Sequence, residues 1–391
     1  MGINFIDEIV RNVKKNVEIS AELIFPVFLA KKDNYNNMRT TFLKGSLFIA
    51  IILAILGNFQ THRLNAQDIH FSQFYASPLT LNPSMTGMIP GCYRATVNFR
   101  NQWSSIPAPF TTVSAGFDMP FLRNIVGSSW AGGGILIFND QAGYGNLNNL
   151  SVLGSLAAHL SIDRESKYVI SLGGQGGWVH KNVNFAKLVF EEQLLANPTD
   201  PSSVPNWEAV DNNIINYFDT RAGAMVSIAP IKKISMYVGG ALFHINKPEE
   251  SFLVNNTNFL DPRTVFHAGF NLQPNRSWSI HPHGIYMAQT GTREIVVGLQ
   301  AGYHFGDNGR SREEPSTAIY FGANYRVKDA INPILGVEYS NFKFGLSYDI
   351  NISDLKVASQ NQGGIELSLG YIGSCYQDSK RHYPPVSCPR F

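Results

Sequence analysis

The segment from residue 341 to residue 350 alternates between two kinds of side chain, and this alternation constrains the fold more than any other feature. One parity carries large apolar groups, at Phe342, Phe344, Leu346, Tyr348 and Ile350. The opposite parity carries polar or small residues, at Asn341, Lys343, Gly345, Ser347 and Asp349. Because side chains of a strand alternate between its two faces, the segment predicts a β-strand with one apolar and one polar face. A tilted strand of about ten residues is long enough to cross the hydrocarbon layer of a membrane.

The same pattern recurs along the chain after residue 67, where helical periodicity is almost absent. Clear copies cover 93–99, 294–303 and 365–371, in which apolar and polar residues again occupy opposite parities. We count fourteen candidate strands, at 93–101, 111–119, 130–138, 150–161, 168–179, 217–228, 235–244, 264–272, 278–288, 294–305, 318–327, 333–339, 342–350 and 365–371. An all-β chain is therefore expected.

The connections between these strands fall into two length classes that alternate along the chain. If the first strand starts on the periplasmic side, the periplasmic turns are short, with 306–315 as the exception, whereas the external loops include the long segments 182–216 and 246–262. This asymmetry is typical of outer-membrane barrels. Because every backbone polar group in lipid must be paired, we predict a closed transmembrane antiparallel β-barrel of about fourteen strands, over residues 91–372.

The composition excludes several other classes of protein. After residue 67 no segment reaches 18 consecutive apolar residues, which excludes a helical membrane protein. The 26 Phe, 16 Tyr and 5 Trp residues exclude a disordered chain. A formal net charge of +2 gives no reason to expect nucleic acid or another polyanion as a partner.

The first 66 residues stand apart from the strand pattern. From Met38, a short basic region precedes the apolar run 47–56 and a polar stretch that ends in a small residue. This order is typical of a secretory signal peptide, which we predict at 38–66, with cleavage before Gln67. Residues 1–37 are then either a mis-annotated stretch upstream of the true start or a genuine N-terminal extension.

Charged residues on the polar parity of the strands are expected to point into the barrel lumen. They are Arg94, Arg100, Arg221, Glu294, Glu338, Lys343, Asp349 and Glu366. Since both signs are present, these side chains can form a cross-strand charge lattice that fills or narrows the interior. The alternative is that they simply keep the lumen hydrated.

The three cysteines lie in the mature chain, in a compartment that permits disulfides. Cys92 opens the first strand and Cys375 follows the last strand, and closure of a barrel makes these two strands neighbours. A Cys92–Cys375 bridge is therefore predicted. The alternatives are a Cys375–Cys388 bridge and free thiols.

The sequence offers no catalytic residues, no metal site and no cofactor site. His281 and His283 share one face of a strand, but a third ligand is not in view. The glycines of 173–177 lie inside a strand with no helix after it, so small residues beside a bulky neighbour or plug are expected there, not a phosphate loop. A protein that is not an enzyme is expected.

The mature N-terminus carries the motif that most narrows the family. Residues 67–83 read QDIHFSQFYASPLTLNP, and with Gly87, Arg94, the NFRNQW of 98–103, the GGIELSL of 363–369 and the terminal CPRF of 388–391 they resemble the PorP/SprF family of the type IX secretion system of Bacteroidetes. The resemblance covers essentially the whole mature chain. Cys92 and Cys375 are departures from the family pattern, as is the stretch before Met38.

The resemblance implies an integral outer-membrane protein of the secretion and gliding motility apparatus. It implies as partners a secreted adhesin or other type IX cargo and periplasmic components, including a peptidoglycan-binding lipoprotein. The external loops would meet the exported partner. The segment 67–90 and the tail 373–391 would lie at the periplasmic mouth, where they either plug it or dock a partner through Phe71, Phe74, Tyr75, Asn82, Pro83, Arg390 and Phe391. The alternative for both ends is structural: they pack inside the barrel and cap its polar interior.

Two other functions are compatible with parts of this pattern. A passive porin or a hydrophobic-solute transporter would need an open lumen or a lateral gap. A secreted soluble β-sandwich adhesin would carry polar outer faces, which the Phe, Leu and Tyr parity contradicts.

Overall fold

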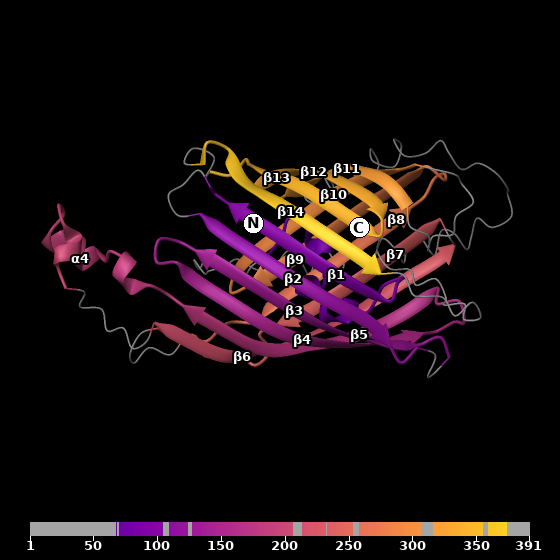
Figure 1. The fold of residues 1–391 in the computed structure, drawn as a ribbon, viewed down its shortest axis with the longest axis horizontal. Helices are drawn as coiled ribbons and strands as arrows, with labels where there is room; N and C mark the ends of the chain where they lie inside the picture. The colour runs from indigo at the N-terminus through magenta and orange to yellow at the C-terminus, as the bar shows by residue number, and fades with distance from the viewer. Residues whose placement is uncertain are drawn as a thin grey trace, which may run out of the picture. The chain divides into compact units, whose positions relative to one another are not determined.

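The strands of the computed structural model close into an antiparallel barrel (Figure 1). The structure describes residue 68 and residues 70–104, 109–123, 127–205, 213–231, 233–252, 258–305, 316–354 and 359–373. Each strand pairs with its neighbours in the chain, and the first strand pairs with the last. The strands are β1 (Tyr93–Gln102), β2 (Phe110–Phe121), β3 (Trp130–Ala142), β4 (Leu147–Ser161), β5 (Tyr168–Asn182), β6 (Ile214–Ile231), β7 (Ile234–Phe243), β8 (Arg263–Leu272), β9 (Trp278–Gln289), β10 (Thr292–Phe305), β11 (Ser316–Arg326), β12 (Ala330–Ser340), β13 (Phe342–Asn351) and β14 (Gln362–Gly373).

The predicted barrel of fourteen strands is confirmed. Every expected strand is present, and the observed bounds differ from the expected ones by a few residues at either end. The largest difference is in β6, which starts at Ile214 and ends at Ile231, beyond the expected 217–228. Strand ends extend past the alternating pattern because backbone pairing continues where the side chains no longer face lipid.

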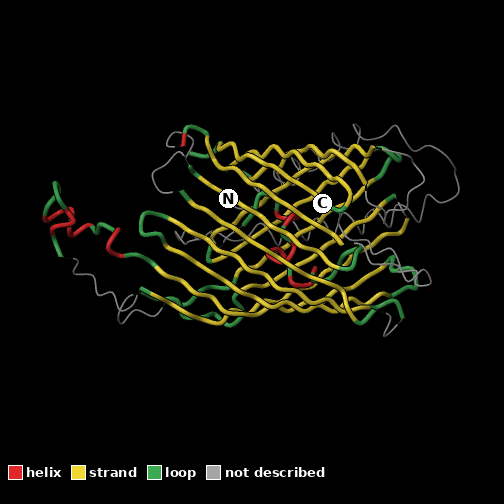
Figure 2. The backbone as a smooth tube through the Cα atoms, viewed as in Figure 1, coloured by secondary structure: helices red, strands yellow, loops and turns green. Residues whose placement is uncertain are grey.

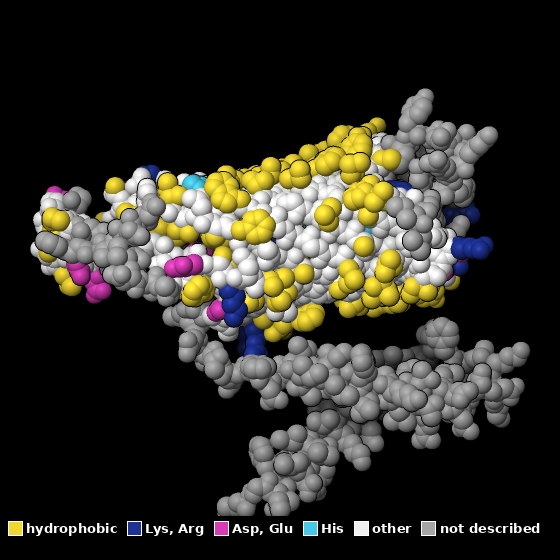
Figure 3. Space-filling view, turned by 90° about the horizontal axis from the view of Figure 1, so that it is seen from below, with side chains coloured by type: hydrophobic (Ala, Val, Ile, Leu, Met, Phe, Trp, Pro, Cys, Tyr) yellow, Lys and Arg dark blue, Asp and Glu magenta, His cyan; other side chains and the backbone are white. Residues whose placement is uncertain are grey.

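The outer surface of the barrel is apolar. The alternation in 342–350 places its large side chains outward, and Phe344, for example, is 50% exposed. Val97 on β1 and Leu299 on β10 follow the same rule at 45% and 55%. Figure 3 shows hydrophobic side chains spread along the drawn face of the barrel, with charged ones gathered toward its two ends. This distribution suits a barrel whose wall contacts acyl chains.

The inner surface is polar, which is the reverse of a soluble β-protein. Asn98, Ser171 and Asn324 are all inward-facing and at most 1% exposed. Buried polar groups need hydrogen-bond partners, so this inner surface requires polar partners within the lumen.

The two ends of the barrel differ. We call the end at which β1 begins and β14 ends the termini end, and the opposite end the loop end. At the loop end, β9 and β10 are joined by Thr290 and Gly291, both with positive φ (42° and 84°), as a tight two-residue hairpin requires. The same end carries the long β5–β6 and β7–β8 connections, in agreement with the predicted asymmetry.

Several expectations concern residues outside the described part of the chain. These are the N-terminal extension at 1–37, the signal peptide at 38–66, and all but the first residue of the tail at 373–391; they stay predictions. Among the described residues, no helix combines the length and the apolar character needed to cross a membrane.

The lumen is filled by the chain's own N-terminal segment, residues 71–91, which we call the plug. It contains three short helices, η1 (Phe74–Ala76), α3 (Pro78–Leu81) and η2 (Pro83–Met85). Figure 2 shows them in red, enclosed by the strands. The proline residues at the starts of α3 and η2 suit the first helical turn, where no backbone N–H is needed.

Candidate functional site

Two residues near the start of the plug are held by one carboxylate. The backbone N–H groups of Ser72 and Gln73 donate to the two oxygens of Glu366 on β14, at 2.8 and 2.7 Å. The Gln73 side chain donates to the Ser347 hydroxyl on β13 at 3.1 Å and accepts from the Ser368 hydroxyl on β14 at 3.0 Å. Two consecutive backbone donors and one side chain therefore fix this part of the plug to neighbouring strands.

A charge network surrounds these two residues. Arg100 on β1 lies 3.0 Å from Asp349 on β13 and 3.4 Å from Glu366 on β14, and Arg326 on β11 lies 2.9 Å from Asp349. The Ser72 hydroxyl donates to Asp349 at 2.9 Å and accepts from Arg100 at 2.9 Å. All four charged side chains are at most 4% exposed. Buried charges of this kind are tolerated only when they are paired and hydrogen-bonded, so the plug completes the network.

The middle of the plug is held by Asn82, which caps η2 by accepting from the Ser84 N–H at 2.9 Å. Its amide nitrogen contacts the carbonyl oxygens of Ala224 on β6 and Gly240 on β7, each at 3.2 Å, and lies 2.9 Å from Nε2 of His267 on β8. One side chain thus reaches three successive strands on the far side of the barrel from Glu366.

The end of the plug is held near the termini end. The Gly87 N–H donates to Asp118 on β2 at 2.7 Å, and the Gly87 carbonyl accepts from the Trp130 indole on β3 at 3.1 Å. Arg94 forms an ion pair of 2.8 Å with the same Asp118. His159 on β4 lies 2.8 Å from the Thr86 carbonyl oxygen. Hydrogen bonds therefore follow the plug from the loop end to the termini end.

Glycines in the wall allow the plug backbone to approach closely. A Cβ atom at Gly173 on β5 would lie 2.4 Å from the Pro83 carbonyl carbon, and one at Gly132 on β3 would lie 2.0 Å from the Thr86 carbonyl oxygen. A Cβ at Gly223 on β6 would meet the Asn82 side chain at 2.0 Å. The 173–177 glycines were expected beside a bulky neighbour or plug, and Gly173 is in that position.

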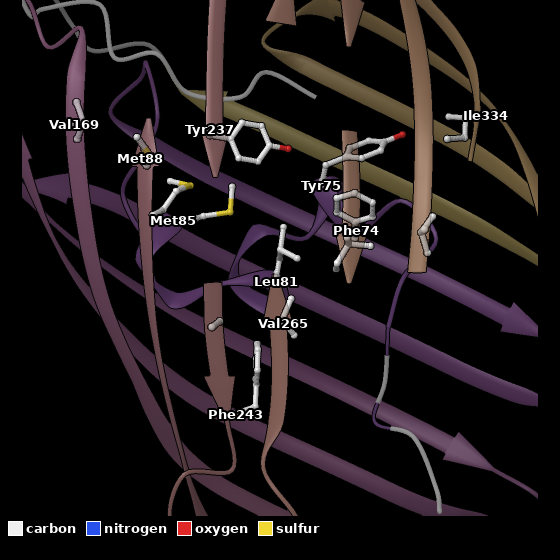
Figure 4. Close-up of a cluster of buried hydrophobic side chains, with 14 of the residues drawn as sticks. Phe74, Tyr75, Leu81, Met85, Met88, Val169, Tyr237, Phe243, Val265 and Ile334 are labelled. Carbon is white, nitrogen blue, oxygen red and sulfur yellow. The ribbon is translucent and has the colours of Figure 1, made fainter. Parts of the chain in front are cut away.

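Apolar side chains fill the space between these polar anchors. Phe74, Leu81 and Met85 of the plug are at most 4% exposed and belong to one buried cluster with side chains of the wall. Figure 4 shows the plug residues beside Tyr237 and Phe243 from β7, Val265 from β8 and Ile334 from β12. The plug is therefore packed as a small hydrophobic core inside an otherwise polar lumen.

The chain before the plug reaches the loop end. Asp68 lies 2.8 Å from Nε2 of His244, just beyond β7, and 3.6 Å from Arg263. His244 also contacts Asp219 on β6 through its other ring nitrogen, at 2.9 Å. Burial acts to raise the pKa of Asp68, but the charges of Arg263 and His244 outweigh it, so this pKa lies well below its ordinary value. Asp68 therefore stays ionised and keeps the chain tied to the loop end.

The residues expected to dock a partner have a different place in the structure. Phe71, Phe74, Tyr75, Asn82 and Pro83 are all buried inside the barrel. We expected residues 67–90 at the periplasmic mouth; the structure instead places the plug within the lumen, as in the structural alternative. The reason is that its polar groups complete those of the wall. Arg390 and Phe391 lie outside the described residues.

The charged residues expected in the lumen lie on the inward parity. Arg94, Arg100, Arg221, Asp349 and Glu366 are at most 8% exposed and form ion pairs with buried partners. The other three are partly buried. Glu294 lies 3.1 Å from His70, Glu338 accepts from the Tyr320 hydroxyl at 2.8 Å, and the Lys343 ammonium lies 4.3 Å from the centre of the Tyr320 ring. Six of the eight residues are therefore in ion pairs, and the other two contact Tyr320.

Sequence reasoning missed several members of this lattice. Asp118, Asp219 and Arg326 supply partners for Arg94, Arg221 and Asp349, and all three sit on the inward parity of their strands. The parity rule could have found them. Asp68 lies outside the strands, so parity gives no signal for it. His244 lies just beyond the end of β7 and has the outward parity of the expected strand 235–244, so parity would have placed it wrongly.

Cys92 forms a disulfide bond, and its N–H donates to the Gly373 carbonyl at the end of β14, at 2.8 Å. The strand that Cys92 opens and the strand that precedes Cys375 are therefore neighbours, as expected. Cys375 lies outside the described residues, so the identity of the partner stays a prediction. Within the described ranges, no group of three or more His, Cys, Asp or Glu residues is placed to hold a metal ion.

The loop end carries a second candidate surface. Lys181 at the end of β5 forms an ion pair with Glu250 of the β7–β8 connection, and the Phe185 and Phe252 rings pack edge to face, 6.0 Å apart. Beyond them lies the short helix α4 (Glu191–Ala196), which Figure 1 shows past the ends of β5 and β6. Its Leu195 side chain is 77% exposed, with Val189 and Leu194 about half exposed beside it in the sequence. We call residues 189–195 the apolar arm.

Solved structures with a similar arrangement of strands include monoaromatic hydrocarbon channels and toluene transporters. The CymD monoaromatic hydrocarbon channel is 12% identical, with a TM-score of 0.43 over 77% of this chain and 94% of that chain. The toluene transporter TbuX of Ralstonia pickettii is 12% identical, with a TM-score of 0.44 over 76% and 93%. The toluene transporter TodX of Pseudomonas putida is 8% identical, with a TM-score of 0.42 over 78% and 94%.

No curated protein matches the chain in sequence. The family model described as type IX secretion system membrane protein PorP/SprF matches residues 63–371. This range takes in the plug and almost the whole barrel, so the match covers both parts of the candidate site. The chain therefore belongs to the PorP/SprF family of type IX secretion system membrane proteins.

Proposed function

We propose that this protein is a non-enzymatic outer-membrane barrel of the type IX secretion and gliding apparatus, which supports export or surface attachment of a large adhesin-like protein. It acts through its two ends and not through its lumen. The loop end faces the outside and meets the exported partner. The termini end faces the periplasm and docks other components of the apparatus, among them a peptidoglycan-binding lipoprotein.

The observation that carries this proposal is the filled lumen. The plug is hydrogen-bonded to strands around the wall, from Glu366 on β14 to Asp118 on β2, and its apolar side chains are buried. Because this segment is anchored inside the lumen, passage of solutes through the barrel is the less favoured role. A protein of a secretion family whose lumen holds its own chain is better suited to binding than to conduction.

The apolar arm supports a binding role for the loop end. Leu194 and Leu195 are exposed on an aqueous loop. Covering large apolar side chains with a partner lowers the free energy and so favours binding. The Lys181–Glu250 pair and the Phe185–Phe252 contact brace the base of this arm against the β7–β8 connection. A braced arm loses less conformational entropy on binding.

The termini end supports a role on the periplasmic side. It carries short turns such as Asn341 between β12 and β13, as the periplasmic end of an outer-membrane barrel does. β10 ends, β11 begins and β14 ends at this same end of the barrel.

The test combines gene deletion with a variant of the apolar arm. Deletion is expected to remove a specific adhesin-like protein from the cell surface while other surface proteins remain. Leu194→Asp together with Leu195→Asp should reproduce that loss with normal barrel levels in the membrane. Thr199→Asp, an exposed change in the same loop, serves as the control and should retain the surface protein.

Two outcomes would contradict the proposal. An unchanged set of surface proteins after deletion would remove the role in export or attachment. Solute flux through the purified barrel at porin rates would favour the alternative, a passive porin or hydrophobic-solute transporter.

A further inference from the structure

The pair formed by β1 and β14 differs from every other strand pair in the barrel. All other pairs join strands that are consecutive in the chain, whereas this seam joins its two ends. Arg100 lies directly opposite Glu366 in the seam, although 266 residues separate them. Because the entropy lost on closing a loop grows with its length, the seam is the pair least favoured by local chain connection.

The plug binds both strands of the seam at the same point. Glu366 on β14 accepts the backbone N–H groups of Ser72 and Gln73. Arg100 on β1 donates to the Ser72 hydroxyl at 2.9 Å, closer than its 3.4 Å contact with Glu366 itself. The two seam side chains are thus joined through the plug more closely than they are joined to each other.

The neighbouring strand is held by the same two residues. Asp349 on β13 accepts from the Ser72 hydroxyl, and Ser347 on β13 accepts from the Gln73 amide. Gly345 on β13 makes room for Gln73, since a Cβ there would lie 2.3 Å from its side-chain oxygen. Three strands, β1, β13 and β14, therefore all contact Ser72 and Gln73 of the plug.

The other half of the plug is held by strands outside the seam, three on the opposite wall and one beside β1. Asn82 contacts β6, β7 and β8, and Gly87 contacts β2. The plug is therefore fixed in the lumen independently of the seam. Ser72 and Gln73 therefore contact the seam from a segment that other strands also hold in place.

We propose that the plug is the internal clasp of the barrel seam: Ser72 and Gln73 hold β1 to β14, and without this contact the seam is the first strand pair to open. Without these two residues, Glu366 loses two buried hydrogen bonds and, within the part of the chain that the structure describes, its carboxylate keeps the 3.4 Å contact with Arg100. A buried carboxylate left short of partners is strongly destabilising. The inference concerns how the wall stays closed and does not rest on the proposed secretion role.

The test compares two covalent locks in a weakened variant that also carries Cys92→Ser, because the disulfide of Cys92, which lies beside the end of β14, would otherwise brace the same seam. Glu366→Gln removes the charge and one of the two acceptors while keeping the side-chain shape. Val97→Cys with Leu369→Cys forms a lock across the seam, because these residues are paired and exposed at 45% and 36%. Val226→Cys with Val238→Cys forms the control lock across β6 and β7, between residues that are paired and exposed at 43% and 62%.

The expected result is a fall of about 5 °C in the Tm of the Glu366→Gln variant in detergent, at least half of which the seam lock restores. The control lock should restore little. Equal rescue by both locks, or rescue by neither, would overturn the proposal, because weakening would then not be centred on the seam. If Glu366→Gln does not fold, Gln73→Ala replaces it and the same comparison of locks decides.

A conductance measurement separates clasp from simple plug. If Glu366→Gln only released the plug from an intact wall, planar bilayers would show stable open channels that the seam lock leaves unchanged. That result would overturn the proposal. The expected result is irregular conductance that the seam lock suppresses and the control lock does not.

Discussion

Arg100 on β1 and Asp349 on β13 form an ion pair inside the barrel, with Nη2 3.0 Å from Oδ2, although their strands are not neighbours. The pair reaches over β14, and Asp349 carries a second guanidinium, that of Arg326. Asp349→Asn would remove a counter-charge from two buried guanidinium groups, leaving Arg100 with Glu366 at 3.4 Å and Arg326 with Asp329 at 2.6 Å. We expect this change to lower the free energy of unfolding by about 3–5 kcal/mol, measured by denaturant unfolding in detergent.

The control for this change is Asp354→Asn, an exposed carboxylate in the connection that follows β13. It should alter the free energy of unfolding by less than about 0.5 kcal/mol. Equal effects of the two changes would mean that the buried network contributes nothing particular to stability.

Gly173→Ala is expected to destabilise the barrel or displace the plug. The added Cβ would lie 2.4 Å from backbone atoms of Pro83 and Ser84, which cannot move aside as the end of a side chain can. Overpacking of this kind costs about 1–3 kcal/mol. Gly174→Ala on the same strand is the matched control, because its Cβ would meet nothing nearer than 4.0 Å. A thermal melt of both variants distinguishes them, and a normal Tm for Gly173→Ala would contradict the close approach.

Leu299→Lys tests whether the apolar surface faces lipid. Leu299 is 55% exposed near the middle of β10, and a lysine at the bilayer midplane costs about 2–4 kcal/mol. Ile162→Lys, 70% exposed just beyond β4, lies at an end and should cost about 1 kcal/mol or less. Folding yields into lipid vesicles compare the two. Stable, monodisperse protein in buffer without detergent would contradict the membrane assignment.

The filled lumen predicts that liposomes containing the purified protein do not swell in solutions of small sugars. The plug occupies the space that a solute would cross, and it is held by hydrogen bonds from Ser72 to Gly87. Liposomes with a general porin provide the positive control. Swelling at a comparable rate would show that the plug leaves the lumen readily.

Cys92 is expected to be joined to Cys375. Cys92 is disulfide-bonded and its N–H donates to the Gly373 carbonyl, and Cys375 follows Gly373 by two residues in the sequence. Peptide mapping without reductant should recover the linked pair, and reduction should lower the free energy of unfolding by about 2–4 kcal/mol. A Cys92 peptide linked to Cys388 would refute the pairing.

The sequence was sufficient for the wall because each strand carries its own signal. In 342–350 every second residue is large and apolar, and the same residues face outward in the structure. Arg100 and Glu366 are predicted to face inward from their positions in the alternating pattern of their own strands. Membership of a strand and its orientation are local properties, so a single sequence contains them.

The plug could not be placed in this way. Residues 71–75, 77–79 and 81–89 are buried almost without interruption, so they show no period of two or 3.6 residues, because their neighbours belong to strands on different sides of the lumen. Asn82 contacts residues more than 140 positions away, and no local pattern records such distances. The glycines of the wall indicated a close neighbour, and packing of the N-terminal segment inside the barrel was only the alternative to a place at the periplasmic mouth.

The direction in which the plug runs bears on the order of events during assembly. Asp68 sits by His244 at one mouth of the barrel, and the same peptide continues into β1 from the other mouth. The plug therefore runs along the length of the lumen and approaches Gly132, Gly173 and Gly223 closely. Because a closed barrel leaves no free space through which the plug could enter, we expect the strands to close around a plug that is already in place.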